Sequence, residues 1–183
     1  MINLPLRRTI SARHSHARGA LTGRRGATAL EFGLVSTALL LLVIGIVEAF
    51  LQLATVAALE YAALRASRFG ITGASTVRNV PSNQLPGSCR SAIIPWIVTY
   101  STNGFLNSNN LTVTMAVYSS INAANGSTGG TSGAGAGGAI VGYTLAYRRA
   151  FITPMAAALA GNANLTHTTT LLVKNEPFED TVC

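Results

Sequence analysis

Charged residues are scarce in this sequence. Only 10% of its 183 residues are charged, whereas 49% are hydrophobic. A chain this apolar is not expected to be disordered, and so little charge is unusual for a cytosolic enzyme. The length allows one domain together with a membrane anchor.

Acidic residues are absent from the first 26 positions, which form a basic leader. Six of the thirteen basic residues lie there: Arg7, Arg8, Arg13, Arg18, Arg24 and Arg25. The rest of the chain has seven basic and six acidic residues, so the leader carries most of the net charge of +7. This near balance excludes a general affinity for nucleic acid or another polyanion. By the positive-inside rule, the leader stays in the cytoplasm and the chain beyond residue 60 lies outside.

Proline is absent from residues 27–70, and charge is absent from residues 32–47. About 20 apolar residues suffice to cross a bilayer, so this stretch predicts a transmembrane helix. We expect one helix from Ala27 to about Gly70, about 60 Å long at about 1.5 Å per residue. Its second half has apolar residues at spacings of three and four, which predicts a stripe that packs against a head domain. The stripe comprises Phe50, Leu53, Ala57, Tyr61 and Leu64.

Glu31 is the carboxylate near the start of the apolar run. A carboxylate inside a spanning helix costs on the order of 2.5 to 3.5 kcal/mol, so a partner for it is expected. Cleavage after Gly26 would create an α-amino group on Ala27 and leave Glu31 as the fifth residue of the shortened chain. That amine on one copy can neutralise Glu31 on its neighbour, which predicts that the pair acts in assembly.

This region resembles the type IV pilin superfamily, in which a prepilin peptidase cuts after a glycine and a glutamate follows five residues later. The basic lead-in, Gly26, Glu31 with Phe32 after it, and the apolar run all match. The segments GATALEFGLV and GIVEAFLQL, and the later Lys-Asn-Glu-Pro at residues 174–177, are most similar to TadE-like minor pseudopilins of tight-adherence (Flp) pilus systems. The arginine that often follows the second segment in that family is absent here.

The resemblance implies a structural protein with a pilin-like α+β fold. It implies processing between Gly26 and Ala27 and charge pairing at Glu31. It also implies that Glu48 contacts another subunit. The alternative is that Glu48 is solvated at the outer membrane interface. The implied partners are the prepilin peptidase, a major Flp-type pilin, other minor pseudopilins and the inner-membrane assembly platform.

The same resemblance implies a location and a role. The protein would lie in the inner membrane of a bacterium with its amino terminus in the cytoplasm and its head in the periplasm. After assembly it would be extracellular, where it initiates, tips or permits export of an adhesive pilus. A periplasmic binding or sensory domain, held by one unprocessed anchor, is the alternative.

Residues 71–183 are expected to form the head. Alternation with a period of two predicts strands over 111–118 and 140–147, and a β-branched run predicts a third over 167–173. The glycine-rich, uncharged tract 122–138 is expected to join the first two as an antiparallel pair across a flexible loop. The result is a small antiparallel sheet of three or four strands.

The segments between these strands and the long helix are shorter. Residues 72–87 are typical of a linker, and residues 88–100 predict a short helix limited or kinked by Pro95, with Trp96 in the core. Residues 151–164 predict a long connection that includes a helical turn.

Cys89 and Cys183 are the only cysteines, and both fall outside the membrane. An even number there indicates a disulfide, and the alternative is a pair of metal-binding or catalytic thiols. The disulfide would close a loop of about 95 residues, worth on the order of 4 to 5 kcal/mol in the chain-entropy model. No histidines or further cysteines at ligand spacing support the alternative.

Groups that carry catalytic chemistry are few. The GAGAGG segment at residues 133–138 satisfies G-x-G-x-x-G but precedes a strand, so no nucleotide site is expected. His14 and His16 lie in the leader and do not predict a metal site. His167 and the acidic cluster are the hydrolase candidates, and a solvated acidic tail is the simpler interpretation. The cluster comprises Glu176, Glu179 and Asp180. We therefore expect no catalytic, cofactor or metal site, and a protein that is the substrate of a peptidase rather than an enzyme.

Overall fold

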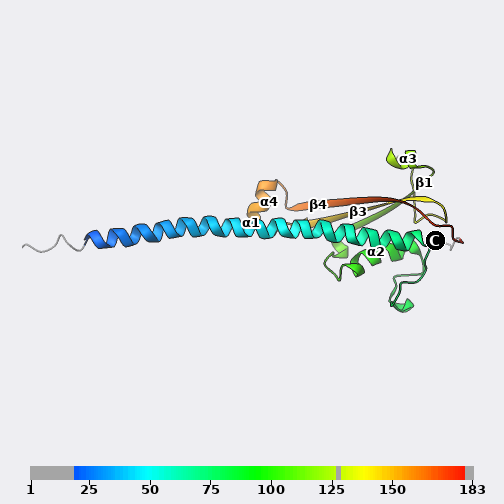
Figure 1. Ribbon diagram of the computed structural model, residues 1–183, viewed down its shortest axis with the longest axis horizontal. Helices are drawn as coiled ribbons and strands as arrows, with labels where there is room; N and C mark the ends of the chain where they lie inside the picture. The colour runs from blue at the N-terminus through cyan, green and yellow to red at the C-terminus, as the bar shows by residue number, and fades with distance from the viewer. Residues whose placement is uncertain (1–18, 127–128, 180–183) are drawn as a thin grey trace, which may run out of the picture. The chain divides into compact units, whose positions relative to one another are not determined.

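The computed structural model describes residues 19–126 and 129–179 (Figure 1). The chain divides into two units, Met1–Gly45 and Ile46–Cys183, and helix α1 contributes to both. The helices are α1 (Gly19–Ile71), α2 (Arg90–Ser101), α3 (Ile121–Asn125) and α4 (Pro154–Ala160). The strands are β1 (Leu111–Tyr118), β2 (Thr131–Ser132), β3 (Ile140–Ala150) and β4 (Asn164–Lys174).

In the first unit, α1 is an apolar helix whose side chains from residue 26 to residue 45 are exposed or half-buried. From Gly26 to Ile71 the helix is long and apolar enough to cross a membrane. It begins at Gly19, eight residues before the predicted start at Ala27. Alanine, leucine and arginine are good helix formers, so the helix extends into the leader despite Gly23 and Gly26.

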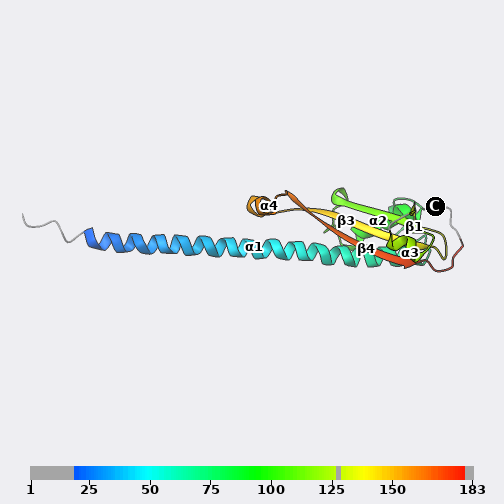
Figure 2. The same ribbon diagram turned by 90° about the horizontal axis from the view of Figure 1, so that it is seen from above.

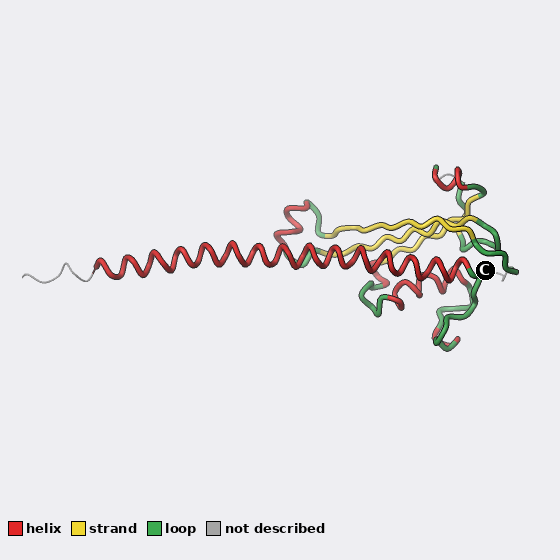
Figure 3. Tube along the Cα trace, viewed as in Figure 1, coloured by secondary structure: helices red, strands yellow, loops and turns green. Residues whose placement is uncertain are grey.

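The second unit contains a four-stranded antiparallel sheet in the order β2-β1-β3-β4. The predicted antiparallel pairing of the first two long strands is confirmed, with Leu111 opposite Tyr147 and Tyr118 opposite Ile140. The glycine-rich tract is more ordered than predicted, because it contains α3 and the short strand β2, which pairs with β1. The longest strands are β3 and β4, with eleven residues each, and the sheet is drawn in yellow in Figure 3.

Both α1 and α2 cover the same face of the sheet. Figure 1 shows the sheet from its edge with the two helices on one side of it, and Figure 2 shows its strands running alongside α1. Alternate strand residues point to this face and form the core with the helices: Leu111, Val113, Met115, Val117, Val141, Tyr143, Leu145, Tyr147, Leu171 and Val173. The opposite face is not covered by α1 or α2, although the short helix α3 lies on that side at the end of β1 (Figure 1). It presents threonines, of which Thr144 and Thr170 bond through their hydroxyls at 3.3 Å.

The face of α1 that packs on the sheet consists mainly of small residues. Leu59 lies among Ala62, Ala63 and Ala66, and all four are fully buried. Gly70 continues this face, and a Cβ there would overlap the Tyr143 hydroxyl of β3. Because the side chains are small, the helix backbone lies close to the sheet.

The stripe predicted to pack against the head is instead exposed, so that prediction is wrong. Phe50, Leu53, Tyr61 and Leu64 are each about half or more exposed. At about 100° per residue, they lie on the opposite side of α1 from Leu59, Ala62 and Ala66. The spacing rule identified an apolar stripe correctly, but large residues do not fit the narrow space between this helix and the sheet.

The other short elements follow their sequence signals. Pro95 lies within α2, and Trp96 is half-buried against the core and stacks on Tyr100 with ring centroids 4.5 Å apart. The predicted helical turn after β3 is α4, which begins at Pro154 and ends before Gly161. Proline is common at the first position of a helix, and a glycine in the left-handed conformation commonly ends one.

The close approach at Gly70 is testable by substitution. Gly70→Ala is expected to lower the free energy of unfolding by about 1–3 kcal/mol, because the methyl group displaces Tyr143 or moves the helix away from the sheet. Gly45→Ala is the matched control, since its Cβ meets nothing within 4 Å. Thermal unfolding of the detergent-solubilised proteins, followed by near-ultraviolet circular dichroism, measures both. Equal stability of the two variants would contradict the close packing.

Candidate functional site

The predicted processing segment lies on one exposed stretch of α1. Gly26, Ala27, Glu31 and Phe32 are all helical and exposed. Within the described part of the chain Glu31 has no hydrogen-bond or ion-pair partner, so its carboxylate is available to another molecule. A peptidase that cut after Gly26, as predicted, would have to open the helix there, and glycine makes that opening less costly by about 1 kcal/mol relative to alanine.

Glu48 is a buried carboxylate, only 7% exposed. Its Oε2 accepts a hydrogen bond from the backbone N–H of Ile152 at 2.8 Å, and its Oε1 accepts one from Gln52 Nε2 at 3.0 Å. The alternative for Glu48, solvation at the membrane interface, does not fit this structure, because the side chain is buried and both oxygens accept hydrogen bonds within the chain. A contact of Glu48 with another subunit stays a prediction.

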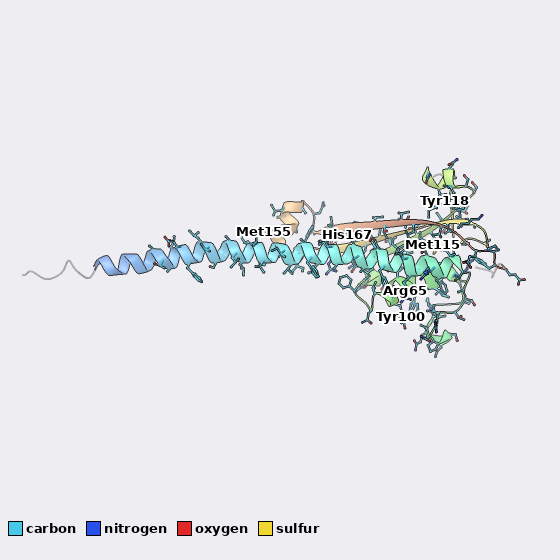
Figure 4. The ribbon with its side chains drawn as sticks, viewed as in Figure 1. Arg65, Tyr100, Met115, Tyr118, Met155 and His167 are labelled. Atoms are coloured by element: carbon cyan, nitrogen blue, oxygen red, sulfur yellow. The ribbon has the colours of Figure 1, made fainter. Side chains whose placement is uncertain are left out.

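His167 extends this polar group to the sheet. Its Nε2 lies 2.8 Å from Gln52 Oε1, and it stands opposite Tyr147 in the register of β3 and β4, on the face that α1 covers. Figure 4 shows His167 beside α1. Met155 of α4 lies near it, beyond the same end of the sheet. This chain of hydrogen bonds thus joins three parts of the fold. It links Glu48 and Gln52 of α1 to His167 of β4 and to the N–H of Ile152 in the β3–β4 connection.

The environment of His167 favours its neutral form. Burial lowers the pKa of the imidazole below its ordinary value of 6.5, and the Arg149 guanidinium lowers it further. The neutral ring can donate from Nε2 to Gln52, which in turn donates to Glu48. The residue that could have been a general base is thus engaged in holding the helix to the sheet.

Arg90 forms a second buried polar group, near the end of α1. It is 4% exposed, and its guanidinium donates to the carbonyl of Gly70 at 3.1 Å and to that of Gly135 at 2.6 Å. It also lies over the ring of Phe178, 4.4 Å from its centroid. A cation among the last carbonyls of a helix is stabilised by the helix dipole.

Asn175 completes the group at this end. Its Nδ2 donates to the carbonyls of Ala134 and Ala136, both at 3.0 Å. The GAGAGG segment is therefore a loop packed around Asn175, as expected for a loop before a strand.

Burial raises the pKa of the Tyr143 hydroxyl, and the nearby Arg90 guanidinium offsets part of this increase. Arg90 Nε, Tyr143 Oη and Asn175 Oδ1 are buried without a hydrogen-bond partner in residues 19–126 and 129–179.

Cys89, next to Arg90, is in a disulfide. Its predicted partner Cys183 lies outside the described residues, as do Asp180, His14 and His16. Glu176 and Glu179 are exposed, and the backbone N–H of Glu176 donates to the carbonyl of Ile71 at 3.0 Å. His167 thus faces α1, and within the described residues no hydrogen bond or ion pair joins it to either carboxylate. No three metal-binding side chains gather anywhere in the described chain.

A shallow groove of about 390 Å³ lies between α1, α2 and the segment after α1. It is lined by Arg65 and Arg78 together with Phe69, Ile97 and Tyr100. Figure 4 shows Arg65 and Tyr100 at this place. Arg65 is partly occupied, since its Nε donates to Tyr61 Oη at 3.0 Å. No sequence pattern predicted this groove, because its two arginines are thirteen residues apart and meet only through the turn after α1.

Comparison of the chain with family models, curated proteins and solved structures finds no match.

The junction at His167 predicts a pH dependence of stability. The unfolded chain takes up a proton on this residue at a higher pH than the folded protein, so the free energy of unfolding falls as the pH drops below the ordinary value of 6.5. In His167→Gln this contribution disappears. Urea unfolding of both proteins at pH 7.5 and 5.5 is the measurement, and the leader histidines serve as an internal control because they are present in both. An equal pH dependence in the two proteins would contradict the assignment.

Proposed function

We propose that this chain is a minor pseudopilin, a non-catalytic subunit that a prepilin peptidase cuts after Gly26 and that takes part in assembling a Tad (Flp) adhesive pilus. One observation carries the proposal: within the second unit, α1 has two apolar faces and only one of them is covered. The sheet covers the face with Leu59 and Ala62, and the opposite face remains exposed.

The exposed face has the form of a helix-packing surface. Phe50, Leu53, Ala57, Tyr61 and Leu64 follow one another at spacings of three and four, which places apolar residues, most of them large, in a row suited to a second helix. Leu64 also borders a shallow apolar groove of about 340 Å³ that reaches Ile71, Leu171 and Val173. Large exposed apolar surfaces on a folded domain mark interaction sites. In a filament, this surface would meet the helices of neighbouring subunits.

Glu31 supplies the second argument for assembly. It is exposed and lies within the apolar part of α1. In lipid a lone carboxylate is unfavourable, and pairing with the α-amino group of Ala27 on an adjacent copy would remove that cost. Only cleavage after Gly26 creates this amine, so processing and assembly are linked in the proposal.

The leader explains the order of these steps. Its six arginines would cost about 15 kcal/mol to draw into the bilayer, at about 2.5 kcal/mol each. The uncut chain would therefore stay in the inner membrane with its head in the periplasm. After cleavage the helix could leave the lipid and enter a pilus.

The alternative is an unprocessed, membrane-anchored binding domain, and the groove at Arg65 favours it. Arg78 and Tyr100 line that groove as well, and two guanidiniums beside an aromatic ring suit a small anionic ligand. Mass spectrometry of the purified protein separates the two functions. A chain that starts at Ala27 supports the pseudopilin, and a chain with its leader intact supports the anchored domain.

The pairing of Glu31 can be tested without changing its shape. Glu31→Gln is expected to be cut normally after Gly26 but to be absent from sheared pili, because the neutral amide cannot pair with the Ala27 amine. Glu31→Asp keeps the charge and serves as the control that retains at least part of the assembly. Immunoblots of membrane and pilus fractions, with the amino terminus determined by mass spectrometry, give both readouts. Normal amounts of Glu31→Gln in the pili would contradict the pairing.

The exposed face of α1 gives an independent test. Leu64→Asp is expected to fold with nearly unchanged stability, within about 0.5 kcal/mol as for exposed sites, but to lose incorporation into pili. Ile121→Asp is the control, since Ile121 is similarly exposed on α3. Thermal unfolding and pilus fractionation are measured on both. Incorporation of Leu64→Asp at the level of the control would show that this face is not used.

A further inference from the structure

The connection between β3 and β4 forms a defined hook, residues 151–163. The backbone N–H of Phe151 donates to the carbonyl of Ala163 at 3.2 Å and closes its base. Thr153 begins α4, since its hydroxyl accepts from the N–H of Ala156 at 3.2 Å. Gly161 ends the helix in the left-handed conformation, at φ 68°. A segment built this regularly holds its side chains in fixed directions.

The outer surface of the hook is apolar. Ile152 is 58% exposed, Met155 45% and Leu159 83%. Residues 151–166 carry no charge at all. Water does not favour three large apolar side chains on so short a segment, and their clustering indicates a surface that is covered in the working protein.

The position of the hook along the chain indicates what covers it. Its residue Ile152 is bonded to Glu48, which directly follows the uncharged run of residues 32–47. If that run spans the bilayer from Glu31, the 17 residues from Glu31 to Glu48 rise about 25 Å, so Glu48 and the hook reach the level where the lipid chains meet the headgroups. The buried Glu48 contact thus fixes the hook to the membrane-proximal end of the head.

Polar groups border the apolar tip. A shallow groove of about 420 Å³ beside the hook is lined by Arg148, Asn162, Asn164 and Thr166. Arg148 is exposed, and neighbouring Arg149 lies over the Phe105 ring, 5.1 Å from its centroid. An apolar tip with an amide and arginine border is the distribution expected of a segment at an anionic membrane surface.

We propose that the hook is a second membrane contact, in which Ile152, Met155 and Leu159 enter the outer leaflet of the same bilayer that α1 crosses. The contact holds the head against the membrane, and Glu48 sets its depth through the N–H of Ile152. It is independent of processing and of any pilus, so it stands or falls separately from the proposed function.

The test measures the depth of a spin label on the uncut, full-length protein. Leu159→Cys carries a nitroxide, and Cys89 does not react because it is in a disulfide. The protein is placed at one copy per nanodisc of phosphatidylethanolamine and phosphatidylglycerol. Ile121→Cys is the control, since α3 follows β1 at the opposite end of the sheet from α4. Because β3 has eleven residues, the two ends of the sheet are about 35 Å apart.

We expect the label at residue 159 to collide more often with oxygen than with a water-soluble nickel chelate. This ratio of collisions corresponds to a depth of about 5–10 Å below the headgroup boundary. The label at residue 121 is expected to show the reverse preference. Nickel accessibility at residue 159 equal to that at residue 121 would overturn the proposal. A label shielded from both reagents would also overturn it, because protein rather than lipid would then cover the hook. Met155→Cys repeats the measurement on the same helix.

Discussion

The fold of the head depends on how closely α1 approaches the sheet. Ala62, Ala63, Ala66 and Gly70 leave no bulk between the helix backbone and β3, and Tyr143 lies directly against Gly70. Dense packing of this kind makes one side of the helix unable to accept larger residues. The large apolar residues of the same helix are consequently placed on the far side, where they remain exposed. One constraint, the thickness of the helix–sheet layer, therefore creates both the core and the exposed apolar surface of α1.

Two buried polar groups fix the ends of this layer. Near residue 48, Glu48 and Gln52 hold the β3–β4 connection and His167. Near residue 70, Arg90 holds the end of α1 together with the loop that precedes β3. Removing one member of a buried network leaves its partners unsatisfied, which typically costs about 1–3 kcal/mol. Such groups fix position as well as stability, because an apolar layer of alanines alone would allow the helix to slide along the strands.

Sequence periodicity predicted the elements of the head well and its contacts poorly. The bounds of β1 and the antiparallel pairing of β1 with β3 agree with the prediction, since alternation reports directly on a half-buried strand. The stripe at Phe50 and Leu53 was assigned to the wrong side, because hydrophobicity does not encode how much space a neighbour leaves. Arg90 and Gln52 were missed as well. Arg90 is buried by chain that arrives more than forty residues later, and only the four-residue spacing of Glu48 and Gln52 hinted at their bond.

The bonds at Glu48 join residues far apart in the sequence: Glu48 meets Ile152 across 104 positions, and Gln52 meets His167 across 115. Contacts of such long range form late in folding. The end of the helix–sheet layer near residue 48 consequently stays open during biosynthesis until β4 has been made. A nascent chain stalled before residue 151 would lack both Ile152 and His167, which leaves Glu48 and Gln52 exposed on an unfinished helix–sheet layer, a defect that quality-control proteases recognise.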